Sequence, residues 1–204
     1  HTAITHLIDH LKDIRNEYPL TPVSILLPST DVIYDLREQL GNAMNVQFYQ
    51  FYRLGNAVLD EAGVPVHELN DTAIRRLIRR ILAELDAEKR LTTFSLVQAK
   101  PGFVEVILDW LREMKSQGID PQQHAEFARE SGDQKDRQLA EIYLRYQSFL
   151  QTRHYSDADG LLWLTAETLE RDPGLFRRDG SLFVSGFDQF TPVQLRILRQ
   201  LAGR

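Results

Sequence analysis

Three short, largely apolar runs lie between turn-forming residues, two near the start of the chain and one near its end. They cover residues 23–27, between two prolines, residues 46–49, and residues 182–184, after an Asp-Gly pair. Runs of this length that are rich in β-branched and aromatic residues predict strands. Amphipathic helical segments separate them, and this alternation is typical of a parallel sheet whose strands are buried on both faces.

Helical periodicity surrounds these predicted strands. Apolar residues recur every three to four positions over residues 4–14, which predicts a first helix. A second helix is expected to begin after Thr30, as its N-cap, and to run to Leu40. A third begins at Phe51 and ends before Gly63. We expect these helices to cover both faces of the sheet, because strands without polar alternation need cover on each side.

The middle of the chain has a different pattern. From about residue 70 to residue 172 every periodic segment is helical, and no segment predicts a strand. One helix is expected to begin at Pro101 and to end before Gly118, with six residues facing inward. These are Phe103, Val106, Ile107, Trp110, Leu111 and Met114. A helical block between the second and third strands of one sheet predicts an inserted subdomain.

The expected fold is therefore α/β and helix-rich overall. Residues 1–66 and 179–204 would form a discontinuous region with a partial parallel sheet of at least three strands. Residues 67–178 would form a large all-helical insert. If this is right, strand 182–184 pairs with strand 23–27 or strand 46–49 despite the long intervening segment.

The composition of the 204 residues narrows the class of protein. Without cysteine the chain has no disulfide, no Cys-based metal site and no thiol nucleophile. Its apolar runs are much shorter than the ~20 residues of a membrane span, and it does not open with a secretory signal. We therefore expect a cytoplasmic protein without membrane contact. The net charge of −5 confines any nucleic-acid contact to a local patch.

Two groups of polar residues have the spacing of metal sites but not the surroundings. His6 and His10, with Asp13 one turn later, lie on the polar face of the first helix and lack the glutamate of a zinc-protease motif. Glu113 and Lys115 have the E-x-K spacing of a nuclease half-site, but the residue between them belongs to an apolar helical stripe. We interpret both groups as solvent-facing residues and predict no metal site.

Two further patterns have an ordinary interpretation beside the functional one. Asp157, Asp159 and Gly160 are similar to part of a calcium loop without its remaining ligands, and helix capping explains them better. Five arginines of the insert form a basic band that phosphates could bind. They are Arg75, Arg76, Arg79 and Arg80, with Arg90 further along. A solvated face balanced by nearby carboxylates is the alternative, and both remain open.

Three segments at predicted strand ends are informative together: residues 25–30, 50–54 and 182–194. The second reads Gln-Phe-Tyr-Arg-Leu, and the third carries Phe-Asp-Gln-Phe-Thr-Pro-Val-Gln after its strand. In order and placement they resemble the first motor domain of UvrD-like superfamily 1 helicases. The second segment fits the pattern T-F-H-x-L of that family with two substitutions. The third resembles its Walker B stretch, V-D-E-F-Q-D-F-T-P-x-Q.

Two positions depart from that pattern. The magnesium-binding aspartate and the catalytic glutamate of the family fall on Ser185 and Gly186, and neither residue brings a carboxylate. This degenerate Walker B segment is similar to that of the B subunit of AddAB-type (RexAB-type) helicase–nucleases, whose helicase-like amino-terminal half has no motor function. The resemblance covers almost the whole chain. It implies a partial P-loop NTPase (RecA-like) sheet without a catalytic residue in this chain.

The resemblance also implies a function. The chain would be a non-catalytic DNA-processing module of an ATP-dependent helicase–nuclease subunit in recombination and DNA repair. It would hold single-stranded DNA and dock against a motor partner subunit. The expected DNA-binding residues are Pro28, Ser29, Thr30, Gln50, Phe51 and Tyr52. Tyr49 and Tyr52 could stack on bases, or they could be half-buried core residues.

Two alternatives stay open. An active ATP-dependent helicase domain would need a phosphate loop upstream, since the Lys-Thr of that loop would fall at His1-Thr2. ATP and magnesium are expected only with such a loop, and we expect no cofactor within the chain itself. A protein-interaction module without nucleic-acid contact is favoured by the negative net charge and by the acidic residues between positions 126 and 136.

Overall fold

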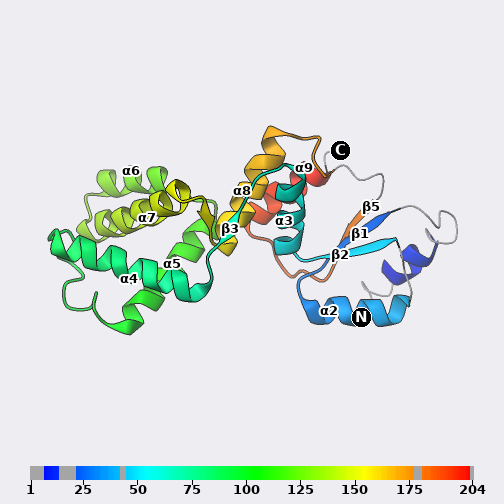
Figure 1. The fold of residues 1–204 in the computed structure, drawn as a ribbon, viewed down its shortest axis with the longest axis horizontal. Coiled ribbons are helices and arrows are strands. Elements are labelled where there is room, and N and C mark those ends of the chain that lie inside the picture. Colours follow the sequence, from blue (N-terminus) through cyan, green and yellow to red (C-terminus); the bar gives the residue numbers. More distant parts are fainter. Residues whose placement is uncertain (1–6, 14–21, 42–44, 177–180, 203–204) are drawn as a thin grey trace. The chain divides into compact units, whose positions relative to one another are not determined.

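The computed structural model describes residues 7–13, 22–41, 45–176 and 181–202. They fall into two compact units (Figure 1). The first unit combines His1–Val64 with Thr165–Arg204 and contains the main sheet. The second, Pro65–Leu164, is mostly helical.

The first unit is built on three parallel strands in the order β2-β1-β5. They are β1 (Val23–Leu26), β2 (Val46–Tyr49) and β5 (Ser181–Val184). Ile25 of the central strand β1 pairs with Phe48 of β2 on one side and with Phe183 of β5 on the other. This confirms the predicted pairing of the third strand with the first. Because β5 lies beside β1, the helical block between β2 and β5 is inserted between two strands of the same sheet.

Burial differs among the three strands. β1 is buried at all four positions, whereas β2 and β5 are partly exposed. The prediction of three buried strands is therefore wrong for the outer two, because only the central strand has a neighbour on each side. One face of the sheet packs against residues 7–13 and against α2 (Thr30–Leu40). Figure 1 shows α3 (Phe51–Glu61) and α9 (Pro192–Ala202) on its other side.

Side-chain caps begin two of the helices that follow strands of the sheet, α2 and α9. Ser29, and not Thr30 as predicted, is the N-cap of α2, and its Oγ accepts a hydrogen bond from the Val32 amide at 3.4 Å. Before α9, Thr191 and Gln194 form a reciprocal capping box. The backbone N–H of Gln194 donates to Thr191 Oγ1 at 3.2 Å, and the backbone N–H of Thr191 donates to the side-chain Oε1 of Gln194 at 3.0 Å.

The second unit packs helices around one apolar core. They are α4 (Asp71–Ala87), α5 (Pro101–Ser116), α6 (Pro121–Ser131) and α7 (Gln134–Thr152), and α8 (Ala158–Arg171) begins in this unit. The core comes mainly from α4, α5 and α7. On α5 the predicted inward residue Val106 is 61% exposed, while Val104 and Leu108 are buried. No helix in the described residues is long and apolar enough to cross a membrane.

The insert is not entirely helical. β3 (His67–Glu68) and β4 (Tyr155–Ser156) form a two-residue parallel ladder, and the Leu69 amide donates to the Ser156 carbonyl at 2.8 Å. This corrects the prediction of an all-helical insert. Two-residue strands are too short to leave a periodic pattern, so the sequence carries no signal for them.

A buried ion pair lies at the start of α8. The Lys115 side chain is only 1% exposed, and its Nζ contacts Asp157 Oδ1 at 2.7 Å and Oδ2 at 2.8 Å. The Tyr146 hydroxyl donates to Asp157 Oδ2 at 2.6 Å. The interpretation of Lys115 as solvent-facing is therefore wrong. Its carboxylate partner lies 42 residues away in the chain, between β4 and α8.

Asp157 is also the cap of α8. The Gly160 amide donates to Asp157 Oδ1 at 2.6 Å, which confirms the capping interpretation of this segment. Burial by itself raises the pKa of Asp157, but the Lys115 charge and the hydrogen bonds from Lys115, Tyr146 and Gly160 lower it below its ordinary value of 3.8. A β-carbon on Gly160 would lie 2.7 Å from Asp157 Oδ1 and 2.9 Å from Lys115 Nζ.

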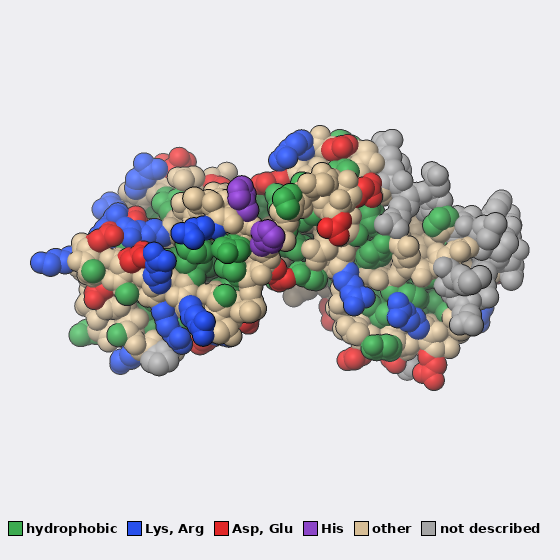
Figure 2. Space-filling view, viewed as in Figure 1, with side chains coloured by type: hydrophobic (Ala, Val, Ile, Leu, Met, Phe, Trp, Pro, Cys, Tyr) green, Lys and Arg blue, Asp and Glu red, His purple; other side chains and the backbone are tan. Residues whose placement is uncertain are grey.

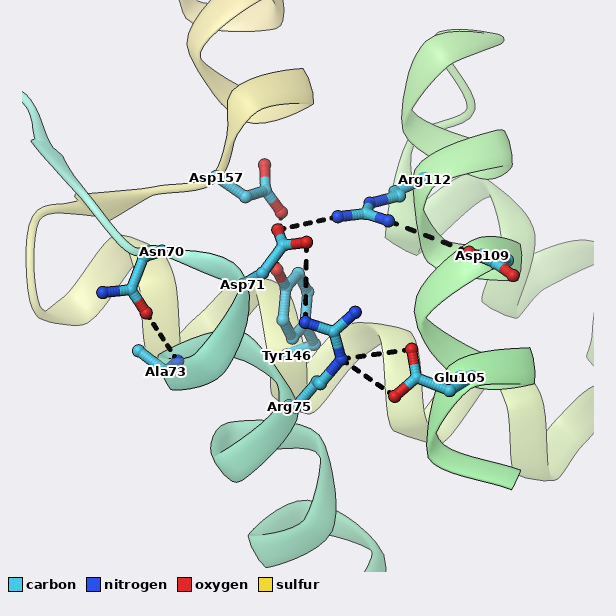
Figure 3. A network of polar contacts seen from close by, with 9 residues as sticks. All are labelled: Asn70, Asp71, Ala73, Arg75, Glu105, Asp109, Arg112, Tyr146 and Asp157. Atoms are coloured by element: carbon cyan, nitrogen blue, oxygen red, sulfur yellow. Dashed lines mark hydrogen bonds and ion pairs between the residues drawn. The ribbon is translucent and has the colours of Figure 1, made fainter. Parts of the chain in front are cut away.

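An exposed network joins α4 to α5 on the surface of the same unit (Figure 3). Arg75 pairs with Asp71 at 3.5 Å and with Glu105 at 2.8 Å. Arg112 pairs with Asp71 at 2.8 Å and with Asp109 at 3.8 Å. Hydrogen bonding from Arg112 lowers the pKa of Asp71. Exposed pairs contribute little to stability individually, so we expect the buried pair to matter more.

The Lys115→Met variant tests that expectation. Removing the cation leaves Asp157 buried without its partner, so the free energy of unfolding should fall by about 3–5 kcal/mol. The control Arg80→Met removes the exposed pair with Glu84 and should cost about 0.5 kcal/mol or less. Urea unfolding followed by circular dichroism measures both variants, and equal effects would contradict the prediction.

The stability of the wild type should also depend on pH through this pair. The pKa of Asp157 is lower in the folded protein than in the unfolded chain. At a pH above the unfolded-state pKa, this difference stabilises the folded protein. The stabilisation is lost as the pH falls through the folded-state pKa. Lys115→Met removes the charge and the hydrogen bond of Lys115, so the pKa of Asp157 is higher in the variant than in the wild type. The free energy of unfolding that Lys115→Met loses relative to the wild type should therefore be larger at about pH 7 than in acid, where Asp157 is neutral in both proteins.

Gly160→Ala is expected to destabilise the protein even though alanine favours helices. The new β-carbon would displace the Asp157 carboxylate or the Lys115 ammonium from a buried position, at a cost of about 1–3 kcal/mol. The matched control is Gly102→Ala in α5, where a β-carbon meets nothing within 4 Å and a small gain is expected. Thermal unfolding of both variants decides the prediction, and a stabilised Gly160→Ala protein would contradict it.

Candidate nucleic-acid interface at the strand ends

The carboxyl ends of the three parallel strands meet at one edge of the sheet. The Leu27 amide donates to the Tyr49 carbonyl at 2.8 Å, and the Ser185 amide donates to the Leu26 carbonyl at 3.2 Å. The structure therefore brings together the segments that follow β1, β2 and β5. All the sequence-predicted site residues lie in these three segments: Pro28, Ser29, Thr30, Gln50, Phe51, Tyr52, Ser185 and Gly186.

Two helices begin at this edge. Ser29 caps α2, and Gln50 is the N-cap residue of α3 without a side-chain cap bond. Gln50 Nε2 instead donates to Thr30 Oγ1 at 3.4 Å and so links the first loop to the second. The first amide groups of a helix have no partner within the helix, and they carry a partial positive charge. This edge can therefore bind the oxygens of a phosphate group.

The aromatic residues of the edge divide into buried and exposed ones. Phe51 is 6% exposed, and its ring packs edge-on against Phe187 at 5.5 Å and Phe190 at 6.1 Å. Tyr49 is also buried, and its hydroxyl donates to Gln47 Oε1 at 2.6 Å. Both rings are therefore core residues, and their ring faces are not exposed for a base to stack on. Tyr52 is 38% exposed at the start of α3.

The segment after β5 carries no carboxylate at the strand end. Ser185 is half-buried, and Gly186 has a φ of 81°, a left-handed conformation that favours glycine. A β-carbon on Gly186 would lie 3.3 Å from Cδ of Pro28. Asp188, the nearest acid along the chain, is exposed. Neither Ser185 nor Gly186 supplies a carboxylate, the protein group through which magnesium is usually held.

An aromatic cluster that sequence reasoning misses holds this edge together. Phe187 and Phe190 lie 4.9 Å apart between their ring centroids, and both contact Phe51 of the second segment. The Phe-x-x-Phe spacing is a signal for such a cluster, but nothing in the sequence indicates that Phe51 would meet it. The cluster joins the start of α3 to the loop before α9 and so fixes where Tyr52 lies.

The remaining sequence motifs lie elsewhere. His6 is outside the described residues, and His10 is exposed with its ring edge-on to Phe183 at 5.5 Å. Across the part of the chain that the structure describes, no three His, Asp or Glu residues are grouped so as to hold a metal. Within the basic band, Arg75, Arg80 and Arg90 pair with carboxylates.

Most of the chain matches a known protein family. A family model described as "ADDB, N-terminal" matches residues 31–204. The B subunit of the ATP-dependent helicase/deoxyribonuclease of Geobacillus kaustophilus is 29% identical over 175 residues, which cover 80% of this chain and 15% of the relative. The protein of the same name in Heliobacterium modesticaldum is 31% identical over 175 residues, which cover 79% of this chain and 14% of the relative.

A third relative aligns over a longer part of the chain. The protein of the same name in Bacillus licheniformis is 26% identical over 213 aligned positions, which cover 97% of this chain and 18% of the relative. The chain thus spans less than a fifth of the length of these curated relatives. These matches confirm the resemblance to the B subunit of helicase–nucleases. Since the family model covers most of its residues, the chain belongs to the ADDB N-terminal family.

Proposed function

We propose that the chain is a non-catalytic, DNA-contacting part of the B subunit of a helicase–deoxyribonuclease that acts in recombination and DNA repair. One observation carries the proposal: three strand ends converge on an edge that offers helix amides, hydroxyls and an exposed tyrosine, but no carboxylate at Ser185 or Gly186. The names of the relatives give the setting, an ATP-dependent helicase/deoxyribonuclease, and their description as subunits supports a partner chain.

The edge would hold a single DNA strand by its backbone and one base. Phosphate oxygens fit the amides at the start of α2 and the exposed hydroxyl of Thr30. The side-chain amide of Gln50 donates to Thr30 Oγ1 and can also donate to the same phosphate. A base can stack on the exposed ring of Tyr52, whose position is set by the burial of Phe51.

The same edge would not hydrolyse ATP. Phosphoryl transfer needs a cradle of amides, a lysine on the phosphates, and carboxylates that hold the metal and orient the water. At the strand end where these carboxylates would lie, the chain has Ser185 and Gly186, and Gly186 is in the left-handed conformation. An ATP-dependent activity would then come from the partner subunit or from other parts of the longer protein.

Tyr52→Ala tests the DNA contact. Fluorescence anisotropy with a labelled oligothymidylate at low salt should show binding by the wild type that is weakened at least about fivefold in the variant, because one stacked base is lost. Tyr52→Phe keeps the ring and should bind like the wild type. Tyr34→Ala removes a tyrosine that is 64% exposed on α2 and serves as the control.

The outcomes of this experiment separate the candidates. Equal affinities of Tyr52→Ala and Tyr34→Ala would contradict the stacking role. Wild-type protein that binds no oligonucleotide even at low salt would favour a protein-interaction module, in line with the net charge of −5.

A second experiment tests the absence of catalysis. In a coupled ATPase assay with magnesium we expect no turnover above background, either in the wild type or in Ser185→Asp. Adding Gly186→Glu should not create activity, and it should destabilise the protein, because the left-handed backbone and the nearby Pro28 ring both disfavour a side chain there. Clear turnover by the wild type would overturn the proposal and favour an active helicase domain.

A further inference from the structure

An open groove lies between α4 and α7 in the helical unit. It has a volume of about 480 Å³, with Leu77 and Ile81 of α4 on one side and Leu144 and Phe149 of α7 on the other. Three arginines also line it: Arg80, Arg145 and Arg153. Figure 2 shows that basic side chains gather over this unit with hydrophobic side chains between them. The groove thus combines an apolar lining with a cationic rim.

The charges of the rim do not cancel. The two lining carboxylates are already engaged, Glu84 by Arg80 at 2.7 Å and Glu141 by Arg145 at 3.0 Å. In the described part of the chain no carboxylate lies within ion-pair distance of Arg153. The same holds for Arg76, one turn before Arg80 on α4. Three arginines against two glutamates leave the lining of the groove with one excess positive charge.

A flat aromatic pair lies at the same end of α7. The rings of Phe149 and Tyr155 stack with centroids 6.4 Å apart and an interplanar angle of 22°. The guanidinium of Arg153 lies over the Phe149 ring at 5.4 Å, and Tyr155 is 38% exposed. An exposed aromatic ring beside an arginine without a carboxylate partner is the combination that receives a base and its phosphate.

We propose that this groove is a second binding site for single-stranded DNA, separate from the strand-end edge. A base stacks on Tyr155, whose ring packs on the groove residue Phe149. The phosphates contact Arg153 and Arg80, with Arg76 one turn earlier on α4. The exposed pair of Arg80 with Glu84 is weak enough for a phosphate to displace it. The choice of ligand rests on the proposed function. The flat stacked rings favour a nucleic acid over an acidic peptide, which would need only the cations.

The test is a charge reversal in the full chain. Arg80→Glu/Arg153→Glu is compared with Arg129→Glu/Arg137→Glu, which makes the same change in net charge at positions of α6 and α7 outside the groove. Anisotropy with a fluorescein-labelled oligothymidylate of about 15 nucleotides is measured over a range of salt concentrations. The groove variant should bind at least about tenfold more weakly, and its salt slope should fall by about 1.4, for two lost phosphates.

The ring is tested separately with Tyr155→Ala, which should weaken binding about fivefold or more, and with Tyr155→Phe, which should restore it. The inference is overturned if both charge-reversed proteins are equally weakened, if the groove variant binds normally, or if polyglutamate competes as well as the oligonucleotide. Loss in Tyr52→Ala with none in the groove variants leaves the proposed function standing and removes only this second site. The reverse pattern removes the strand-end site and supports the groove.

Discussion

The pairing of β1 with a neighbour on each side is the constraint on which the sheet unit depends. β5 reaches β1 only after the whole helical block has been made, so the sheet is complete only when distant parts of the chain have met. Parallel pairing then leaves no choice about direction: all three strands end at one edge. The composition of the candidate site follows from this arrangement, because each strand contributes the residues that happen to follow it.

Much of the fold could be predicted from local patterns. The three strands, the helix that begins at Pro101 and its end before Gly118 all follow from periodicity and turn residues. α6 escapes such a prediction because its residues are mostly polar, although Asp120-Pro121 is a good helix start and Asp120 does cap it. Spacing alone places Val106 inward, but which face of a helix is buried depends on the helices around it.

The candidate site can be predicted by position but not by environment. The strand-end segments meet as expected, yet Phe51 and Tyr49 are buried while Tyr52 is exposed. The burial of Phe51 depends on its contacts with Phe187 and Phe190, which come from a distant part of the chain. Lys115 shows the same difficulty in the insert. A lysine in a helix is ordinarily exposed, and only the arrival of Asp157 and Tyr146 from other elements makes its burial tolerable.

The contact between Gly186 and Pro28 has a consequence for how the family can change. A side chain at position 186 is strained at the left-handed φ of 81°, and its β-carbon would crowd the ring of Pro28 after β1. A single substitution there meets two obstacles at once, while a paired change at positions 28 and 186 removes one of them. The two positions should therefore covary among relatives, and a relative with an acidic residue at 186 should also differ in its first strand-end loop.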